Sequence, residues 1–169
     1  MISKNLEKEF NKQINAELFS AYLYQSMGAY FSSVNLSGFA NWMDVQAEEE
    51  CMHARKFYDY IIERGGKVKL QAIEEPKSEW NSTLEVFEAA YEHEQKITSL
   101  INKLVDIAEE EKDHASKSFL QWFIDEQVEE EASVDEIVQK LKMIGDSANG
   151  IFMLDSNLGQ RTIEVNDSE

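Results

Sequence analysis

The chain has 169 residues, one proline, seven glycines, one cysteine and a formal net charge of -17. This length suits one domain with its own core, and the large share of Glu, Lys, Leu, Ala and Gln predicts an all-helical protein. The negative charge argues against nucleic acid or an anionic membrane as a partner and suits metal cations. The single cysteine gives no sign of an oxidising compartment, and the charged start of the chain contains no hydrophobic signal core. No apolar run reaches membrane-spanning length, so a cytoplasmic protein is expected.

Two long helices are expected in the first third of the chain. Apolar residues at helical spacing predict the first over residues 5–33, with Ser3 or Asn5 as its N-terminal cap. The second is expected over residues 37–64, with Ser37 as a candidate cap and a glycine pair to stop it. Together they predict a helical hairpin.

A long connection and a second pair of helices follow. Residues 65–81 show no helical period and are too many for a turn between neighbours, so this segment is expected to run the length of a bundle. The third helix is expected over residues 82–111. Ser82 or Thr83 would cap it, and Glu85 would complete a capping box with Ser82.

The fourth helix is expected over residues 114–144 and a short fifth helix over residues 149–158, before a polar tail at 159–169. The apolar piece at 151–154 would either cover the end of the bundle or pack against other copies of the chain. The predicted architecture is a four-helix bundle with a long crossover between its second and third helices and a short C-terminal helix.

Each long helix carries polar residues within its apolar stripe, near its middle: Glu17, then Glu50 and His53, then Glu94, then Gln127 and Glu130. The spacing repeats, because 33 and 36 residues separate Glu17 from Glu50 and His53, and the same intervals separate Glu94 from Gln127 and Glu130. Four carboxylates in one buried layer cannot all ionise without cations. Two divalent ions would balance their charge, and oxygen ligands with a single imidazole favour Fe(II) or Mn(II).

The chain resembles the bacterial non-haem ferritins, members of the ferritin-like di-iron superfamily, over essentially its whole length. The residues that carry this resemblance are Glu17, Tyr24, Glu50, His53, Glu94, Trp122, Gln127 and Glu130. A glutamate from two helices with Glu-x-x-His from others is a known di-iron pattern of this superfamily. The resemblance implies iron storage, with oxidation of Fe(II) to Fe(III) by dioxygen or peroxide. The ferric oxyhydroxide mineral would be held in a cage of 24 identical subunits.

The resemblance also implies three iron sites. Site A would use Glu17, Glu50 and His53, and site B would use Glu50, Glu94 and Glu130, with Glu50 as the bridge and Gln127 beside the pair. A third site would use Glu49, Glu126, Glu129 and Glu130; the last three share a helix face.

Two departures separate this chain from related families. Bacterioferritins and rubrerythrins carry Glu-x-x-His on the second hairpin as well, whereas this chain has Gln127 and Glu130 there. Iron in site B is therefore expected to be in transit rather than a fixed cofactor. Cys51 occupies the position of the haem-ligating methionine of bacterioferritins, so no haem is expected.

Several single residues allow two interpretations. Tyr24 suits core packing or a redox or hydrogen-bonding role at the centre, and Trp122 suits the core better than electron donation. His93 and His114 are expected on the surface, and Cys51 is expected to be inert.

The main alternative function is a di-iron peroxidase or oxygenase of the rubrerythrin or bacterioferritin type. A helical assembly protein without metal is a third class, which the four buried carboxylates disfavour. The DNA-coating mini-ferritins match less well, because they lack the fifth helix and form their site between subunits.

Overall fold

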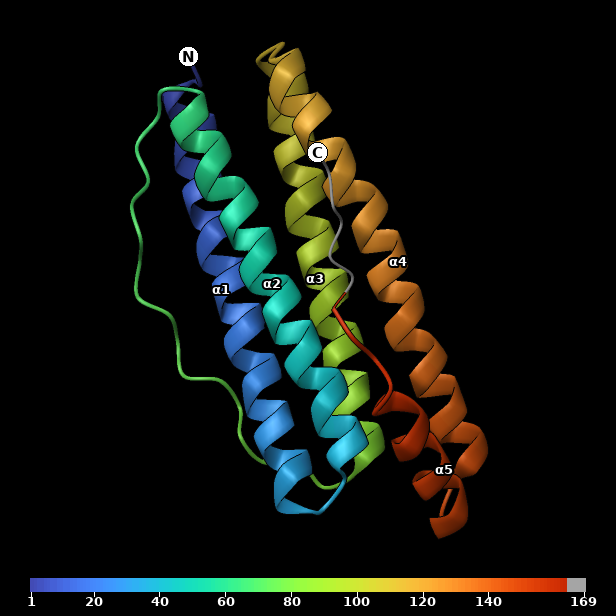
Figure 1. Ribbon diagram of the computed structural model, residues 1–169. Helices are drawn as coiled ribbons and strands as arrows, with labels where there is room; N and C mark the ends of the chain where they lie inside the picture. The colour runs from blue at the N-terminus through green and yellow to red at the C-terminus, as the bar shows by residue number, and fades with distance from the viewer. Residues whose placement is uncertain (164–169) are drawn as a thin grey trace.

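The computed structural model describes residues 1–163, so most of the predicted polar tail lies outside the described residues. Within them, five helices follow one another, and no strand occurs: α1 (Lys4–Ser33), α2 (Ser37–Glu63), α3 (Thr83–Glu110), α4 (His114–Ile144) and α5 (Ala148–Leu158). Figure 1 shows α1 to α4 as a bundle of two hairpins, with α5 at one end. The all-helical fold with a short fifth helix is confirmed, and the helix ends lie within two residues of their predicted positions.

The helix caps agree with the sequence at two of three positions. The Ser3 hydroxyl accepts a hydrogen bond from the Leu6 N–H, and the Ser82 hydroxyl accepts one from the Glu85 N–H. The Glu85 carboxylate turns back to the N–H of Asn81 rather than to that of Ser82, so the capping box is displaced by one residue. Ser37 was wrongly predicted as a cap, because it already belongs to α2 and no local side chain caps that helix.

The crossover between α2 and α3 runs along the outside of α1 for the length of the bundle, as Figure 1 shows. Side-chain amides and a hydroxyl of α1 hold it in place. Asn11 donates to the Lys67 carbonyl at 3.0 Å, and Asn15 donates to the Ala72 carbonyl at 3.0 Å. The Ser26 hydroxyl donates to the Lys77 carbonyl at 2.7 Å. These bonds satisfy backbone groups that no strand or helix partner reaches.

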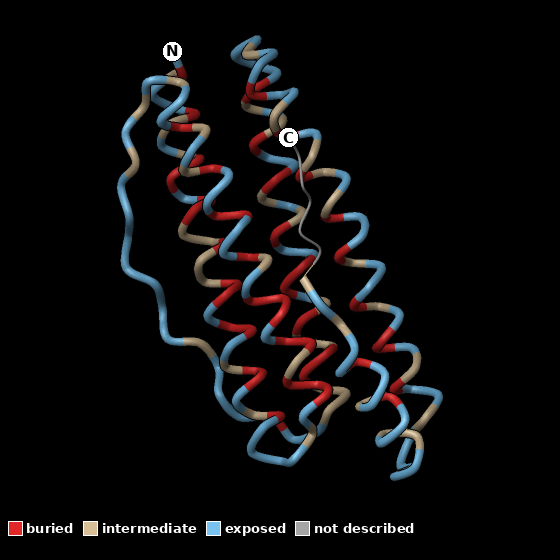
Figure 2. The backbone as a smooth tube through the Cα atoms, in the orientation of Figure 1, coloured by how far each residue is buried: buried red, intermediate tan, exposed pale blue. Residues whose placement is uncertain are grey.

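Two apolar clusters fill the bundle, one towards each end. Phe31, Phe39 and Trp42 belong to the cluster near α5, and Phe10 and Phe57 belong to the cluster at the opposite end. Figure 2 shows the buried residues on the inward faces of all four long helices. The polar layer predicted from the sequence lies between these two clusters. Within the described residues, no helix has the combination of length and apolar character needed to cross a membrane.

The fifth helix caps the second from a distance in the sequence. One carboxylate oxygen of Asp155 accepts from the Gly38 N–H at 2.8 Å and from the Phe39 N–H at 3.0 Å. A Cβ at Gly38 would lie 1.7 Å from the Asp155 carbonyl oxygen, so only glycine permits this approach. Leu154 and Leu158 are buried on the same side, which fixes α5 against α2.

Replacing Asp155 with alanine is expected to destabilise the protein by about 1 kcal/mol, because two N–H groups at the start of α2 lose their acceptor. For a chain of this size, that loss corresponds to a melting temperature lower by about 2–4 °C. Calorimetry measures it, and faster amide exchange in α5 should accompany it. Asp146→Ala, at an exposed position just before α5, is the matched control. An equal effect of both substitutions would contradict the capping role.

Candidate metal centre

The predicted polar residues meet in the middle of the bundle. Glu17 from α1, Glu50 and His53 from α2, Glu94 from α3 and Glu130 from α4 are all at least nine-tenths buried. Each helix presents its polar residue from the same stripe that carries its core residues, so the layer replaces one level of apolar packing. Burying carboxylates in this way is costly unless their charge is compensated.

Two groups of three side chains could each hold a metal ion. Glu17, Glu50 and His53 form one, and Glu50, Glu94 and Glu130 form the other; the possible ligand atoms of each group lie within 4.8 Å of one another. Glu50 belongs to both groups, which places its carboxylate between them. These are the residues expected for sites A and B.

Two carboxylate oxygens without a hydrogen-bond partner belong to residues of these possible metal-binding groups. Glu17 Oε2 and Glu130 Oε2 are fully buried and have no hydrogen-bond partner among the described residues. His53 Nδ1 lies 3.3 Å from a Glu50 oxygen and 4.0 Å from a Glu130 oxygen. Buried carboxylate oxygens without donors are rare, and a bound cation is a common explanation for them.

The pKa values of the buried carboxyl groups rise because burial penalises their charged form. Burial, together with the charge of Glu50, raises the pKa of Glu17 from 4.5 to about 8. Burial also raises the pKa values of Glu50, Glu94 and Glu130, and repulsion between neighbouring carboxylates adds to this at Glu50 and Glu130. The cluster therefore keeps protons that a metal ion would displace.

Tyr24 and Gln127 complete the inner shell around Glu94. The Tyr24 hydroxyl donates a hydrogen bond to Glu94 Oε1, and the Gln127 amide donates to Glu94 Oε2 at 3.2 Å. Tyr24 is fully buried. Of the two interpretations of Tyr24, the geometry supports a hydrogen-bonding role in addition to packing.

An outer groove of about 760 Å³ borders this centre between α2 and α4. Glu126 points into it with one oxygen 3.8 Å from His53 Nε2, and His53, Glu126 and Glu130 form a third group that could hold a cation. Glu49 and Glu129 line the groove but do not join this group. The Glu49 carboxylate instead forms an ion pair with Arg161, which follows α5.

Two glutamines support the glutamates of the first hairpin. Gln13 donates to Glu17 at 2.8 Å, and Gln46 donates to Glu50 at 3.0 Å and to Glu130 at 2.8 Å. Sequence reasoning assigned them no role, although a signal was present. Each lies four residues before its glutamate, and the two are 33 residues apart, the same interval that separates Glu17 from Glu50.

The remaining sequence expectations have mixed outcomes. His93 was wrongly predicted on the surface. Its side chain is buried, its ring nitrogen lies 2.7 Å from the Ser20 hydroxyl, and burial lowers its pKa to about 4. His114 and Cys51 are exposed. Trp122 is half-buried, with its ring 5.4 Å from that of His53 at an angle of 73°.

A four-helix bundle with carboxylate groups in its core defines a class of helical proteins whose interior could hold metal ions. The chain belongs to the ferritin family: the model of the ferritin-like domain matches residues 7–144.

Curated relatives extend the match to nearly the whole chain. A bacterial non-heme ferritin of Bacteroides fragilis is 50% identical over 161 residues, which cover 95% of this chain and 100% of the relative. One from Staphylococcus aureus is 42% identical over 164 residues, which cover 97% and 99%.

Solved structures agree with these relatives. A novel open pore ferritin from the archaeon Archaeoglobus fulgidus is 53% identical, with a TM-score of 0.95 over 96% of this chain and 100% of that one. A closed form of that ferritin, engineered by site-directed mutagenesis, gives a TM-score of 0.96 at 53% identity over 96% and 99%.

Proposed function

We propose that this protein stores iron and is a ferroxidase, which oxidises Fe(II) to Fe(III) with dioxygen or peroxide at the buried carboxylate layer. The observation that carries the proposal is the pair of three-residue groups that share Glu50. A shared carboxylate can bridge two ions, and two-metal centres hold their ions about 3.5–4 Å apart. Glu17 and His53 would complete site A, and Glu94 and Glu130 would complete site B.

The residues of this centre divide the work between binding and proton movement. Each of two Fe(II) ions gives one electron to the same oxidant, so dioxygen becomes hydrogen peroxide or peroxide becomes water. Protons that the buried carboxyl groups release when iron enters are available for this reduction. Tyr24 and Gln127 each donate a hydrogen bond to one of the two carboxylate oxygens of Glu94. These bonds would fix the orientation of Glu94 as a ligand of site B. With Gln127 and Glu130 in place of the glutamate and histidine of a second Glu-x-x-His motif, site B would release its iron readily.

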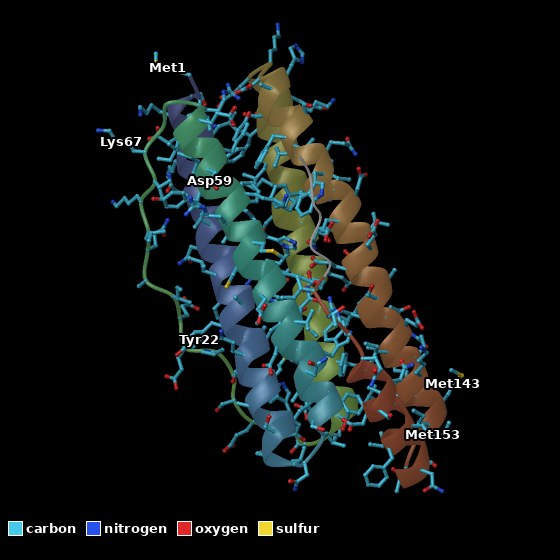
Figure 3. All side chains as sticks on the ribbon, in the orientation of Figure 1. Met1, Tyr22, Asp59, Lys67, Met143 and Met153 are labelled. Atoms are coloured by element: carbon cyan, nitrogen blue, oxygen red, sulfur yellow. The ribbon has the colours of Figure 1, made fainter. Side chains whose placement is uncertain are left out.

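Oxidised iron would then pass to the outer groove and on to a mineral inside a cage of 24 subunits. Glu126 and Glu130 begin that path, and Glu49 and Glu129 line it. The apolar surface of α5 supports assembly, since the side chains of Phe152 and Met153 are 67% and 75% exposed in the single chain. Figure 3 places Met153 and Met143 together at the α5 end of the bundle.

Addition of Fe(II) to the apo-protein in air tests this function. We expect a fast rise in ferric absorbance that accounts for about two irons per subunit, followed by slow mineral growth. Mass photometry should give a particle of about 470 kDa, which is 24 copies of the 19.5 kDa chain. A monomer or dimer that oxidises a few irons and turns over an organic substrate would instead support the peroxidase or oxygenase alternative.

A further inference from the structure

The segment after α5 brings an arginine into the outer groove. In Figure 1 this segment leaves α5 and turns back along the bundle, in the space between α2 and α4. The Asn41 side-chain amide donates to the Arg161 carbonyl at 3.0 Å, which attaches the segment to α2. Arg161 and Thr162 then form part of the lining of the groove.

The Arg161 side chain is held by four groups of α2. Its guanidinium lies 4.4 Å from the centre of the Trp42 ring and donates to the Trp42 carbonyl at 3.3 Å. One of its nitrogens donates both to Gln46 Oε1 at 2.9 Å and to the Glu49 carboxylate. A planar guanidinium suits such simultaneous stacking and hydrogen bonding, and its side chain is only 24% exposed.

Arg161 therefore places a positive charge in the same groove as His53, Glu126 and Glu130, the three side chains that could hold an outer cation. It neutralises Glu49, an acid that the resemblance assigned to the third iron site. It also fixes the Gln46 amide so that its NH2 group faces Glu50 and Glu130. One side chain thus contacts an outer acid directly and the bridging glutamate of the inner centre through Gln46.

We propose that Arg161 is a positioning residue whose positive charge occupies the outer groove. A third metal ion must displace the Arg161 side chain before it can bind Glu49. The same displacement releases Gln46, so the outer ion and the inner pair influence each other through Arg161. This inference rests on the proposed function, because it requires that cations bind the inner layer and the groove.

Removal of the Arg161 charge should change the metal affinities of the outer groove and of the inner centre in opposite directions. In Arg161→Gln, affinity for the outer ion is expected to rise about tenfold, within the usual range of coupling between sites. Affinity for the inner pair should fall about tenfold, because Gln46 loses the group that orients its donors. A residue that merely stabilises the fold would weaken both. Arg161→Lys keeps the charge but loses the planar guanidinium that stacks on Trp42, so its outer-ion affinity should lie between those of the parent and Arg161→Gln.

Zinc binding to the apo-protein tests this without iron chemistry. Equilibrium dialysis and calorimetry would give the number of Zn(II) ions per subunit and their affinities in the parent and each variant. Arg55→Gln is the matched control, since Arg55 also lines the groove but pairs with the exposed Asp59 at 2.8 Å. In the parent, exchange of the amides at 159–163 should quicken when the outer ion binds, as measured by mass spectrometry.

The outcomes separate the two proposals. If Glu50→Gln leaves the tight zinc sites intact, the proposed inner metal centre is wrong, whatever the affinities measured for Arg161→Gln. If Glu50→Gln removes them while Arg161→Gln leaves the outer affinity unchanged or weakens it, the role given to Arg161 is overturned. An outer affinity that rises equally in Arg55→Gln would also overturn it, because net charge alone would then account for the effect.

Discussion

Glu50→Gln is expected to slow Fe(II) oxidation by at least about a hundredfold, because one carboxylate is lost from both three-residue groups. Glutamine has the same shape and can still accept the hydrogen bond from Gln46, so the bundle should fold and the particle should assemble. The loss should appear as the absence of the fast phase in stopped-flow absorbance. Slow oxidation at the protein surface would remain.

Glu48→Gln provides the control for this measurement. It makes the same chemical change two residues earlier in α2, at an exposed position. We expect it to oxidise iron at the parent rate. A Glu50→Gln variant with a normal fast phase would remove Glu50 from the centre and would contradict the proposed ferroxidase mechanism.

The metal-free protein is expected to lose stability as the pH rises from about 4.5 to about 8. In this window the folded protein keeps a proton on Glu17, whose pKa is raised from 4.5 to about 8, whereas the unfolded chain releases it. Unfolding therefore becomes easier with rising pH, at about 1.4 kcal/mol per pH unit for one group. Over this window Glu17 alone contributes about 5 kcal/mol, present below pH 4.5 and lost above pH 8.

Glu17→Gln removes this titration, since glutamine stays neutral and can accept the bond from Gln13. The variant should melt close to the parent at pH 5 and well above it at pH 8.5, as scanning calorimetry of the metal-free proteins would show. Glu48→Gln should follow the parent at both values. Zinc should stabilise the parent more at pH 8.5 than at pH 5, because fewer protons must be displaced. Equal slopes for the parent and Glu17→Gln would contradict the raised pKa.

The sequence predicted features that depend on neighbouring residues, and it failed to predict several features that depend on contacts between distant segments. Ser3 and Ser82 cap their helices because a hydroxyl can reach an N–H within the same turn. Ser37 does not, because Asp155 reaches the same N–H groups from another helix. His93 was wrongly predicted on the surface because the sequence pattern offers it no matching partner, whereas in the fold Ser20 on α1 supplies the partner that allows its burial.

The sequence by itself determined the four-helix bundle, the crossover and the candidate ligands of the inner layer. Helical periodicity places Glu17, Glu50, His53, Glu94 and Glu130 on inward faces, and the repeated intervals bring them to the same level. Only the tertiary structure decided which residues surround them. The contact of Gln46 with Glu130 and that of Arg161 with Glu49 join segments 84 and 112 residues apart. No periodicity encodes such contacts. The first depends on how α2 and α4 face each other across the bundle, and the second depends on how α5 packs against α2 and where the chain continues from it.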